Sequence, residues 1–251
     1  MDIPKDHPRY DSLVTRERLT DLVEKGLVTP TGLISHGRGE AFDYLLGERT
    51  TDAALEAEKA AAAHLLNAKR PVICVNGNAA ALDAKRLIEL ASVTNSKIEV
   101  NIFHRTEERM VSLIRYMKEN GAENVLGGTP DARIPGLSSD RALCTNEGIF
   151  SSDVILVPIE DGDRAEALVR MNKIVIAIDL NPLSRTSKAA SVSIADEMSR
   201  ALINMIRFAK ELKNDEKGRK NVLSAFSNAV NRTETMKAIC DNLMSATDDK
   251  K

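Results

Sequence analysis

The stretch DVILVPIEDGDRAEALVRMNKIVIAIDLNPLSRTSKAA (Asp153–Ala190) decides the fold expected of this chain. It contains two short apolar runs, Val154–Val157 and Ile174–Ile178, on either side of a segment with helical character, Arg164–Met171. Nearly continuous apolar runs joined by a helix are typical of parallel strands that are buried on both faces. We therefore expect a strand–helix–strand unit of a parallel sheet here.

The second apolar run is followed by a polar segment, Asp179–Lys188. In parallel sheets the carboxyl ends of the strands open into the ligand crevice, so side chains of this segment are candidate ligand contacts. Asp179 and Asn181 supply acceptors that suit a ribose, while Arg185 and Lys188 supply donors that suit a phosphate. The same letters also fit an ordinary solvated turn. The pattern favours an anionic ligand without naming it.

A second notable stretch is TPTGLISHGRGEAFDY (Thr29–Tyr44). Its glycines would let the backbone approach a ligand closely. Arg38 stands between two glycines and could bind phosphate or carboxylate bidentately, or could be an ordinary surface residue. A lone histidine such as His36 is more often structural than catalytic. The third glycine of a dinucleotide fingerprint is missing, and no GxxxxGK[ST] phosphate loop occurs in the chain.

Two further strands are expected, at Pro71–Val75 and Ile98–Phe103. Polar residues at their ends could contact a ligand, although a plain strand-to-helix turn explains the first equally well. These residues are Asn76, Asn78, His104 and Arg105.

Helices are expected over most of the remaining chain. Helical spacing of apolar residues predicts helices at about Asp11–Lys25, Thr51–Lys69, Leu82–Ser92, from Thr106 to Gly121, at Asp196–Lys213 and at Asn221–Met244. Asn214–Lys220 is charged and is predicted to be a linker, whereas Asp131–Leu143 is predicted to be a loop with Arg133 and Arg141 exposed. This alternation of strands and helices indicates an α/β fold with a mainly parallel sheet.

Composition excludes several classes of function. The 251 residues carry a formal net charge of only −2 and 3% aromatic residues without tryptophan, which argues against nucleic-acid binding. The three cysteines form no CxxC pair, so neither a disulfide framework nor a zinc site is indicated. No signal peptide or membrane-spanning segment is recognisable, and we expect a cytoplasmic protein.

Six blocks of the sequence resemble the archaeal phosphopantothenate synthetase family, also called 4-phosphopantoate–β-alanine ligases. The blocks are IPKDHPRY (Ile3–Tyr10), GLISHGRGEAFDYLLGE (Gly32–Glu48), VNGNAAAL (Val75–Leu82), RTEER (Arg105–Arg109), LVPIEDGDRAEALVRM (Leu156–Met171) and IDLNPLSRTS (Ile178–Ser187). They span roughly residues 3–213. We therefore expect a ligase domain at residues 1–213 and a C-terminal helical extension at residues 214–251.

The resemblance implies a Rossmann-like homodimer of coenzyme A biosynthesis. Such an enzyme joins the carboxylate of 4-phosphopantoate to the amine of β-alanine, with ATP and Mg²⁺, and releases AMP and pyrophosphate. It further implies that ATP is bound by Arg16, Arg38, Asp179, Leu180, Asn181, Arg185, Thr186, Glu197 and Met198. Helical spacing alone makes Arg16 a surface residue and places Met198 inward, so Met198 would contact ATP through its backbone.

The chemistry of that reaction suggests roles for other residues. His104 and Arg105, or Asn76 and Asn78, could hold 4-phosphopantoate. A base is needed to give a neutral attacking amine, and the candidates are His36 and Glu40. The alternatives are a non-catalytic nucleotide-binding protein, a phosphosugar-binding α/β protein and an oxidoreductase, the last of which lacks its glycine fingerprint.

Overall fold

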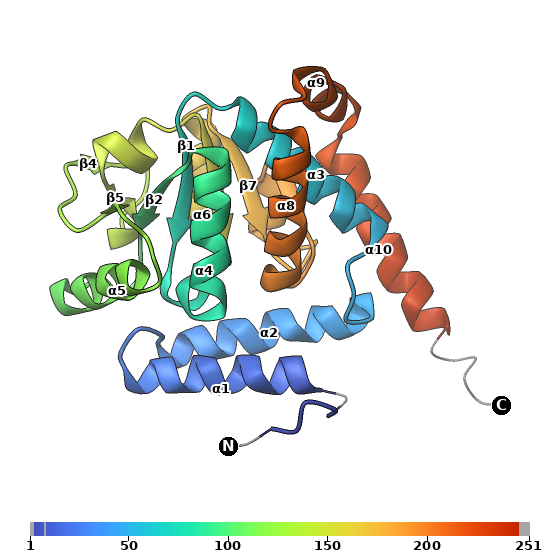
Figure 1. The fold of residues 1–251 in the computed structure, drawn as a ribbon, viewed down its shortest axis with the longest axis horizontal. Helices are drawn as coiled ribbons and strands as arrows, with labels where there is room; N and C mark the ends of the chain where they lie inside the picture. The colour runs from blue at the N-terminus through green and yellow to red at the C-terminus, as the bar shows by residue number, and fades with distance from the viewer. Residues whose placement is uncertain (1–2, 8, 246–251) are drawn as a thin grey trace.

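A computed structural model describes residues 3–7 and 9–245 of the chain. Within these residues the core is a six-stranded sheet in which every neighbouring pair of strands is parallel. Its strands are β1 (Pro71–Val75), β2 (Lys97–Val100), β3 (Val125–Leu126), β6 (Val154–Pro158), β7 (Ile174–Ile178) and β8 (Val192–Ile194). The predicted α/β fold with a mainly parallel sheet is confirmed (Figure 1).

The strand order is β3-β2-β1-β6-β7-β8. The chain runs outward from β1 to β3, then returns to β6 beside β1 and runs outward again to β8. Counted within the sheet alone, this is the 3-2-1-4-5-6 order of the doubly wound Rossmann fold. Because the winding direction reverses between β1 and β6, the connections that follow these two strands diverge. A ligand crevice is expected at that point, outside the carboxyl ends of the strands.

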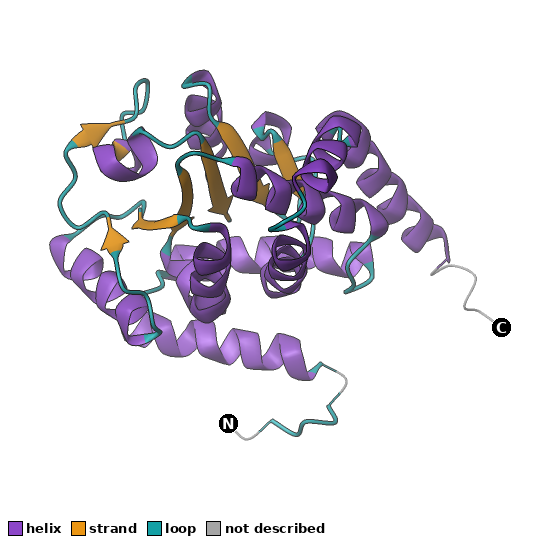
Figure 2. Ribbon diagram, turned by 45° about the horizontal axis from the view of Figure 1, so that its top comes forward, coloured by secondary structure: helices purple, strands orange, loops and turns teal. Residues whose placement is uncertain are grey.

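Helices cover both faces of the sheet (Figures 1 and 2). Since successive side chains of a strand point to opposite faces, Ile73 and Val75 of β1 join one core cluster while Val72 and Cys74 join the other. The first cluster lies against α3 (Asp52–Asn67), α4 (Gly77–Thr94), α5 (Glu107–Glu119) and α8 (Met198–Leu212), and the second against α6 (Gly162–Arg170).

Some predicted bounds need correction. The strand predicted at Ile98–Phe103 is β2 and ends earlier, at Val100. The helix predicted from Leu82 is α4 and begins at Gly77, because the Asn76 side chain caps it by accepting a hydrogen bond from the N–H of Ala79. Asp83 has non-helical backbone angles and breaks α4 near its start.

A helical hairpin, α1 (Tyr10–Glu24) and α2 (Pro30–Leu46), lies across the carboxyl edge of the sheet (Figure 1). The stretch Thr29–Tyr44, for which the sequence predicted no helix, is therefore helical from Pro30 onward. The Thr29 side chain caps α2 by accepting from the N–H of Gly32, and Pro30 occupies the first turn, where a missing N–H costs nothing. Gly47 ends the helix in a left-handed conformation, φ +84°.

The C-terminal segment forms two helices, α9 (Glu216–Ala225) and α10 (Asn228–Ser245). The prediction of a linker at Asn214–Lys220 is wrong, since Asp215 caps α9 by accepting from the N–H of Gly218. Helix α10 packs against α3, α2 and β8. Its Asn228 accepts from the N–H of Ser193 and donates to the carbonyl of Ala190, so the edge strand β8 is covered rather than open to another chain.

None of the helices within residues 3–7 and 9–245 is both long and apolar enough to cross a membrane.

Candidate active site

Two cavities lie at the carboxyl edge of the sheet beneath α2, and they share a wall. The larger, about 700 Å³, lies between α2 and the ends of β6, β7 and β8. The smaller, about 340 Å³, lies between the start of α2 and the ends of β1 and β2. Ser35, Ile159 and Asp161 line both. The cavities therefore meet just beyond the end of β6, at the switch point of the sheet.

The larger cavity gathers segments that are far apart in the sequence. Its volume lies within the roughly 300–1,000 Å³ typical of small-ligand pockets. Eight of the nine residues that the resemblance assigns to ATP line it: Arg38, Asp179, Leu180, Asn181, Arg185, Thr186, Glu197 and Met198. They come from α2, from the connection after β7 and from the connection between β8 and α8.

The connection after β7 is held in shape by its own side chains. The Asp179 carboxylate accepts hydrogen bonds from the N–H of Asn181 at 3.0 Å and from the hydroxyl of Ser184 at 2.5 Å. Ser184 in turn caps the short helix α7 (Arg185–Ala189) by accepting from the N–H of Ser187. Burial raises the pKa of Asp179. The predicted polar segment is thus an ordered turn followed by a helix that sequence reading did not predict.

Two arginines from different helices bring positive charge to the larger cavity. Arg38 is exposed on α2, and Arg185 is 66% exposed at the start of α7. Arg185 forms an ion pair with Glu166 of α6 at 3.0 Å. Long exposed side chains of this kind can reorient toward a ligand at small cost, because a surface ion pair contributes about 0–1 kcal/mol.

Glu197 and Met198 have structural roles at this cavity. Glu197 caps α8 by accepting from the N–H groups of Ser199 and Arg200, and burial raises its pKa. Met198 is 3% exposed and points inward, as helical spacing predicted.

Arg16 is the one residue of the predicted ATP set that does not line the larger cavity. Its guanidinium binds Glu40 of α2 at 2.9 Å and the hydroxyl of Tyr44 at 3.1 Å. Burial of Glu40 opposes its ionisation, but hydrogen bonds from Arg16 and Ser12 outweigh this and lower its pKa. Glu40 therefore acts as the partner of Arg16 here. His36 lines the larger cavity, and its partial burial lowers its pKa and favours the neutral imidazole.

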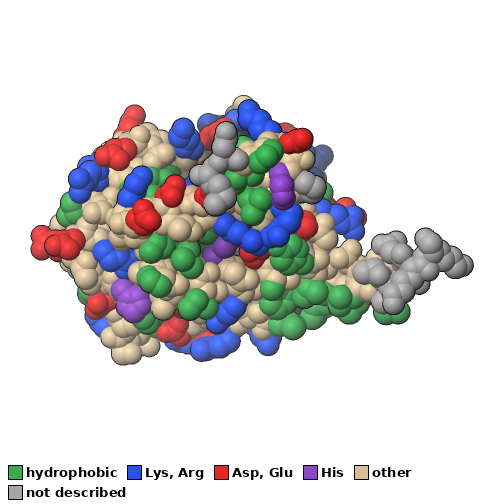
Figure 3. All heavy atoms as spheres, turned by 90° about the horizontal axis from the view of Figure 1, so that it is seen from below, with side chains coloured by type: hydrophobic (Ala, Val, Ile, Leu, Met, Phe, Trp, Pro, Cys, Tyr) green, Lys and Arg blue, Asp and Glu red, His purple; other side chains and the backbone are tan. Residues whose placement is uncertain are grey.

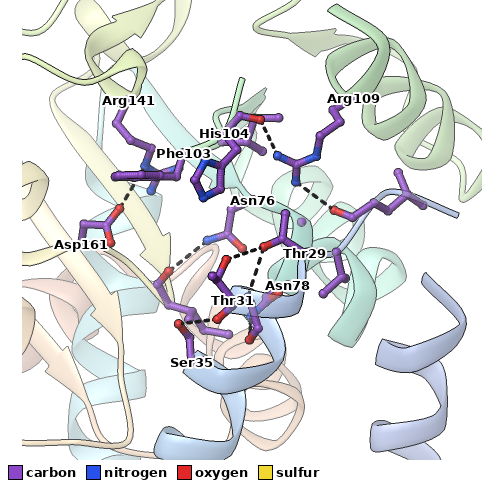
Figure 4. A pocket seen from close by; sticks show the side chains of 16 residues that line it. Thr29, Thr31, Ser35, Asn76, Asn78, Phe103, His104, Arg109, Arg141 and Asp161 are labelled. Carbon is purple, nitrogen blue, oxygen red and sulfur yellow. Dashed lines mark hydrogen bonds and ion pairs between the residues drawn. The ribbon is translucent and has the colours of Figure 1, made fainter. Parts of the chain in front are cut away.

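Polar side chains line much of the smaller cavity (Figure 4). Asn76, Asn78 and His104 line it, as do several residues that sequence reading did not propose: Thr29, Thr31, Ser35, Arg109, Arg141 and Asp161. Arg109 donates to the carbonyls of Gly26 and Leu27 and so fastens the turn between α1 and α2 to the start of α5.

Three of the proposed substrate contacts are already engaged within the protein. Arg105 lies outside both cavities and donates to the carbonyls of Gly127 and Gly128. The Asn76 amide donates to the carbonyls of Pro158 and Ile159, in addition to capping α4. Both side chains therefore hold the strand ends in place. The Asn78 amide, in a residue that is 8% exposed, donates to the carbonyl of Gly32 of α2 at 2.8 Å. His104 is thus the predicted substrate contact best placed to face a ligand.

Arg141 was predicted to be exposed, and this is wrong, because it is 3% exposed. Its guanidinium binds the Glu160 carboxylate, which is also bound by Arg164, 0% exposed. Two buried cations thus share one buried anion directly beneath the shared wall. The ion pair between Glu160 and Arg164 could have been predicted, because the two residues lie four apart just after a buried strand. No local pattern connects Glu160 with Arg141, which comes from a distant loop.

The fold and the cavities define a class. The chain is a doubly wound α/β protein whose double cavity lies at the topological switch point, the usual ligand site of such folds.

Comparison with known sequences identifies the family. Residues 53–242 match the family described as Phosphopantothenate/pantothenate synthetase. A protein of Methanosarcina mazei is 56% identical over 86% of this chain and 85% of its own length. A protein of Methanospirillum hungatei is 56% identical over 85% of this chain and 87% of its own length. A protein of Thermococcus onnurineus is 47% identical over 96% of this chain and 93% of its own length. All three are named 4-phosphopantoate–β-alanine ligase. The chain belongs to the phosphopantothenate/pantothenate synthetase family, and the matched region includes α9 and most of α10.

Proposed function

We propose that this protein is an ATP-dependent ligase that joins 4-phosphopantoate to β-alanine, forming 4′-phosphopantothenate and releasing AMP and pyrophosphate. The observation that carries the proposal is the pair of adjoining cavities, of which the larger is lined by eight of the nine expected ATP contacts. The printed names of the relatives supply the two substrates.

The proposal assigns the two substrates to different cavities. ATP occupies the larger one, where Arg38 and Arg185 contact phosphate oxygens and Asp179 or Asn181 contacts the nucleoside. The 4-phosphopantoate occupies the smaller one, near Asn78 and His104. Its carboxylate then lies at the shared wall, facing the α-phosphate of ATP. Such an arrangement turns a reaction between two molecules into one within a single complex, which is worth about 7–11 kcal/mol in favourable cases.

The reaction proceeds in two steps in this proposal. A carboxylate does not react with an amine until one of its oxygens becomes part of a leaving group. The carboxylate oxygen of 4-phosphopantoate therefore attacks the α-phosphorus, pyrophosphate leaves, and an acyl-adenylate forms. Fixed cations stabilise the negative charge that builds on the phosphates in this step.

Mg²⁺ is proposed to arrive with the triphosphate. Within residues 3–7 and 9–245, no group of three or more His, Cys, Asp or Glu side chains could hold a metal ion. The separate carboxylates that line the larger cavity suit Mg²⁺, because this ion keeps several waters and is held mainly by substrate phosphates with one or two carboxylates. The ion would neutralise phosphate charge during adenylation.

A homodimer is also proposed. Exposed apolar side chains on α2 and α10 include Ile34, 64% exposed, and Met244, 69% exposed. Figure 3 shows hydrophobic side chains gathered on the face formed by the hairpin and along α10. Arg16 does not line the larger cavity of its own chain, and this proposal assigns it to the ATP of the second subunit.

The wider setting is proposed on the family relationship. We infer a role in coenzyme A biosynthesis and a cytoplasmic location. We also retain the division into a ligase domain at residues 1–213 and a helical extension at residues 214–251, with the extension packed onto the domain.

A single assay tests the proposed function. The protein is incubated with ATP, Mg²⁺, 4-phosphopantoate and β-alanine, and products are followed by mass spectrometry. The proposal expects 4′-phosphopantothenate and AMP in equal amounts, both absent when either substrate is omitted. A protein that binds ATP without forming AMP would instead be a nucleotide-binding protein, and turnover without ATP would indicate phosphosugar chemistry.

A further inference from the structure

We propose that Asp161 binds the ammonium group of the amine substrate and accepts its proton, so that a neutral nitrogen attacks the activated carboxyl. This inference deepens the proposed function and rests on it. No sequence pattern pointed to Asp161, which reads simply as part of a turn between a strand and a helix.

Asp161 lies at the wall that the two cavities share. Of the three residues that line both cavities, Ser35 and Ile159 carry no charge, and Asp161 is the carboxylate. If the nucleotide and the acyl substrate occupy one cavity each, the bond between them forms at the shared wall. The amine that attacks the acyl carbon must therefore bind at the shared wall as well. Figure 4 shows Asp161 there, next to Arg141.

The Asp161 carboxylate is free to accept new hydrogen bonds. The other carboxylates that line the larger cavity each accept at least two: Glu160, Asp179, Asp196 and Glu197. Asp161 precedes α6 at the capping position, where an aspartate normally accepts from the N–H groups of the first turn. It accepts no such bond, and within residues 3–7 and 9–245 its carboxylate has an ion pair with Arg141 Nε at 3.4 Å.

The surroundings of Asp161 suit a proton acceptor. Its side chain is 49% exposed, so a proton can leave to solvent. Partial burial and the nearby Glu160 raise its pKa, with Asp163 adding to this effect and Arg141 and Arg164 opposing it. A carboxylate with a raised pKa is a stronger base than an ordinary one. Gly162 also allows the turn to approach α7, because a Cβ there would lie 2.4 Å from Cβ of Arg185.

The ammonium group gives one proton to the Asp161 carboxylate and becomes a neutral amine. Its lone pair forms the C–N bond to the acyl carbon, the C–O bond to the phosphate breaks, and AMP leaves with that electron pair. The second proton of the nitrogen follows to solvent after Asp161 has released the first.

The test separates the two half-reactions in wild type and Asp161→Asn. Adenylation is measured as 4-phosphopantoate-dependent exchange of labelled pyrophosphate into ATP, without β-alanine. Acyl transfer is measured with β-alanine and, separately, with hydroxylamine, which is uncharged at neutral pH and needs no base. Asp52→Asn, the same change at an exposed position of α3 outside both cavities, is the matched control.

We expect Asp161→Asn to exchange pyrophosphate and form the hydroxamate within about threefold of wild type, while ligation of β-alanine falls about 10²–10³-fold. Equal loss of exchange and ligation would overturn the role of Asp161 and place it in adenylation. Unchanged ligation would overturn it as well. Absence of exchange in the wild type itself would instead remove the acyl-adenylate of the proposed function, and the inference with it.

Discussion

Arg200 of α8 binds Asp43 of α2 with both terminal nitrogens of its guanidinium, and it also binds Asp196 at the end of β8. Asp43 and Arg200 are 157 residues apart in the sequence. The contact ties the helix that carries Arg38 and His36 to the body of the protein beside the larger cavity. Asp43 and Asp196 are both buried, and buried carboxylates without a cation nearby would destabilise the folded state. Arg200 places one positive charge between the two.

Replacement of this arginine should destabilise the protein. Arg200→Ala leaves two buried carboxylates without their partner, and we expect the free energy of unfolding to fall by about 3 kcal/mol. Urea denaturation measures this. Lys210→Ala, which removes an exposed ion pair with Glu89 on the same helix, should cost less than about 1 kcal/mol. Equal effects of the two substitutions would contradict the structural role given to Arg200.

Arg38 should be needed for ligation but not for folding. It is exposed on α2 and lines the larger cavity. We expect Arg38→Ala to abolish ligation and to leave the melting temperature unchanged, because a phosphate contact is lost without any loss of packing. The control is Arg49→Ala, an exposed arginine outside both cavities. Wild-type rates for Arg38→Ala would remove this residue from the site.

Glu58 of α3 makes stability depend on pH. It is 0% exposed, and burial, with the nearby Asp196, raises its pKa to about 10. A carboxyl whose pKa is higher in the folded state binds a proton that the unfolded chain has lost, so stability falls as pH rises from about 4.5 toward 10. Glu58→Gln keeps the shape of the side chain but cannot ionise. Relative to wild type, its stability should increase by about 2–3 kcal/mol between pH 6 and pH 8, because uptake of a full proton is worth about 1.4 kcal/mol per pH unit. A constant difference across that range would show that Glu58 does not titrate as described.

Deletion of residues 214–251 should destabilise the remaining chain. It uncovers α3 and removes the hydrogen bonds that Asn228 makes at β8 and that Asn231 makes to the carbonyl of Ala53 at 2.6 Å. We expect a melting temperature lower by several degrees, measured by circular dichroism. A deletion with unchanged stability would show that the extension contributes nothing to the fold.

The sequence predicted the sheet better than it predicted the site. The bounds of β1 and β7 agree with the predicted strands, because each is an apolar run bounded by polar residues or proline. The order of strands depends on pairing between distant segments, so the switch point between β1 and β6 could not be located from local patterns. The set of ATP residues came from resemblance, and the structure places all but Arg16 around one cavity.

Residues held by distant partners were the hardest to predict. Arg141 lies in a polar loop and reads as exposed, yet it is buried because its guanidinium binds the buried carboxylate of Glu160, which Arg164 also binds. The pairing of Arg16 with Glu40 depends in the same way on the packing of α1 against α2. In both cases the decisive contact joins segments that no local pattern connects.

The central claim is that the carboxylate of 4-phosphopantoate attacks the α-phosphorus of ATP at the wall shared by the two cavities. It is tested by ligation of 4-phosphopantoate labelled with ¹⁸O in its carboxylate, followed by mass spectrometry of the nucleotide product. We predict that each AMP released carries one ¹⁸O atom, because the attacking carboxylate oxygen stays on the α-phosphorus when the acyl group is transferred. Recovery of the label in inorganic phosphate, with ADP as the nucleotide product, would contradict it.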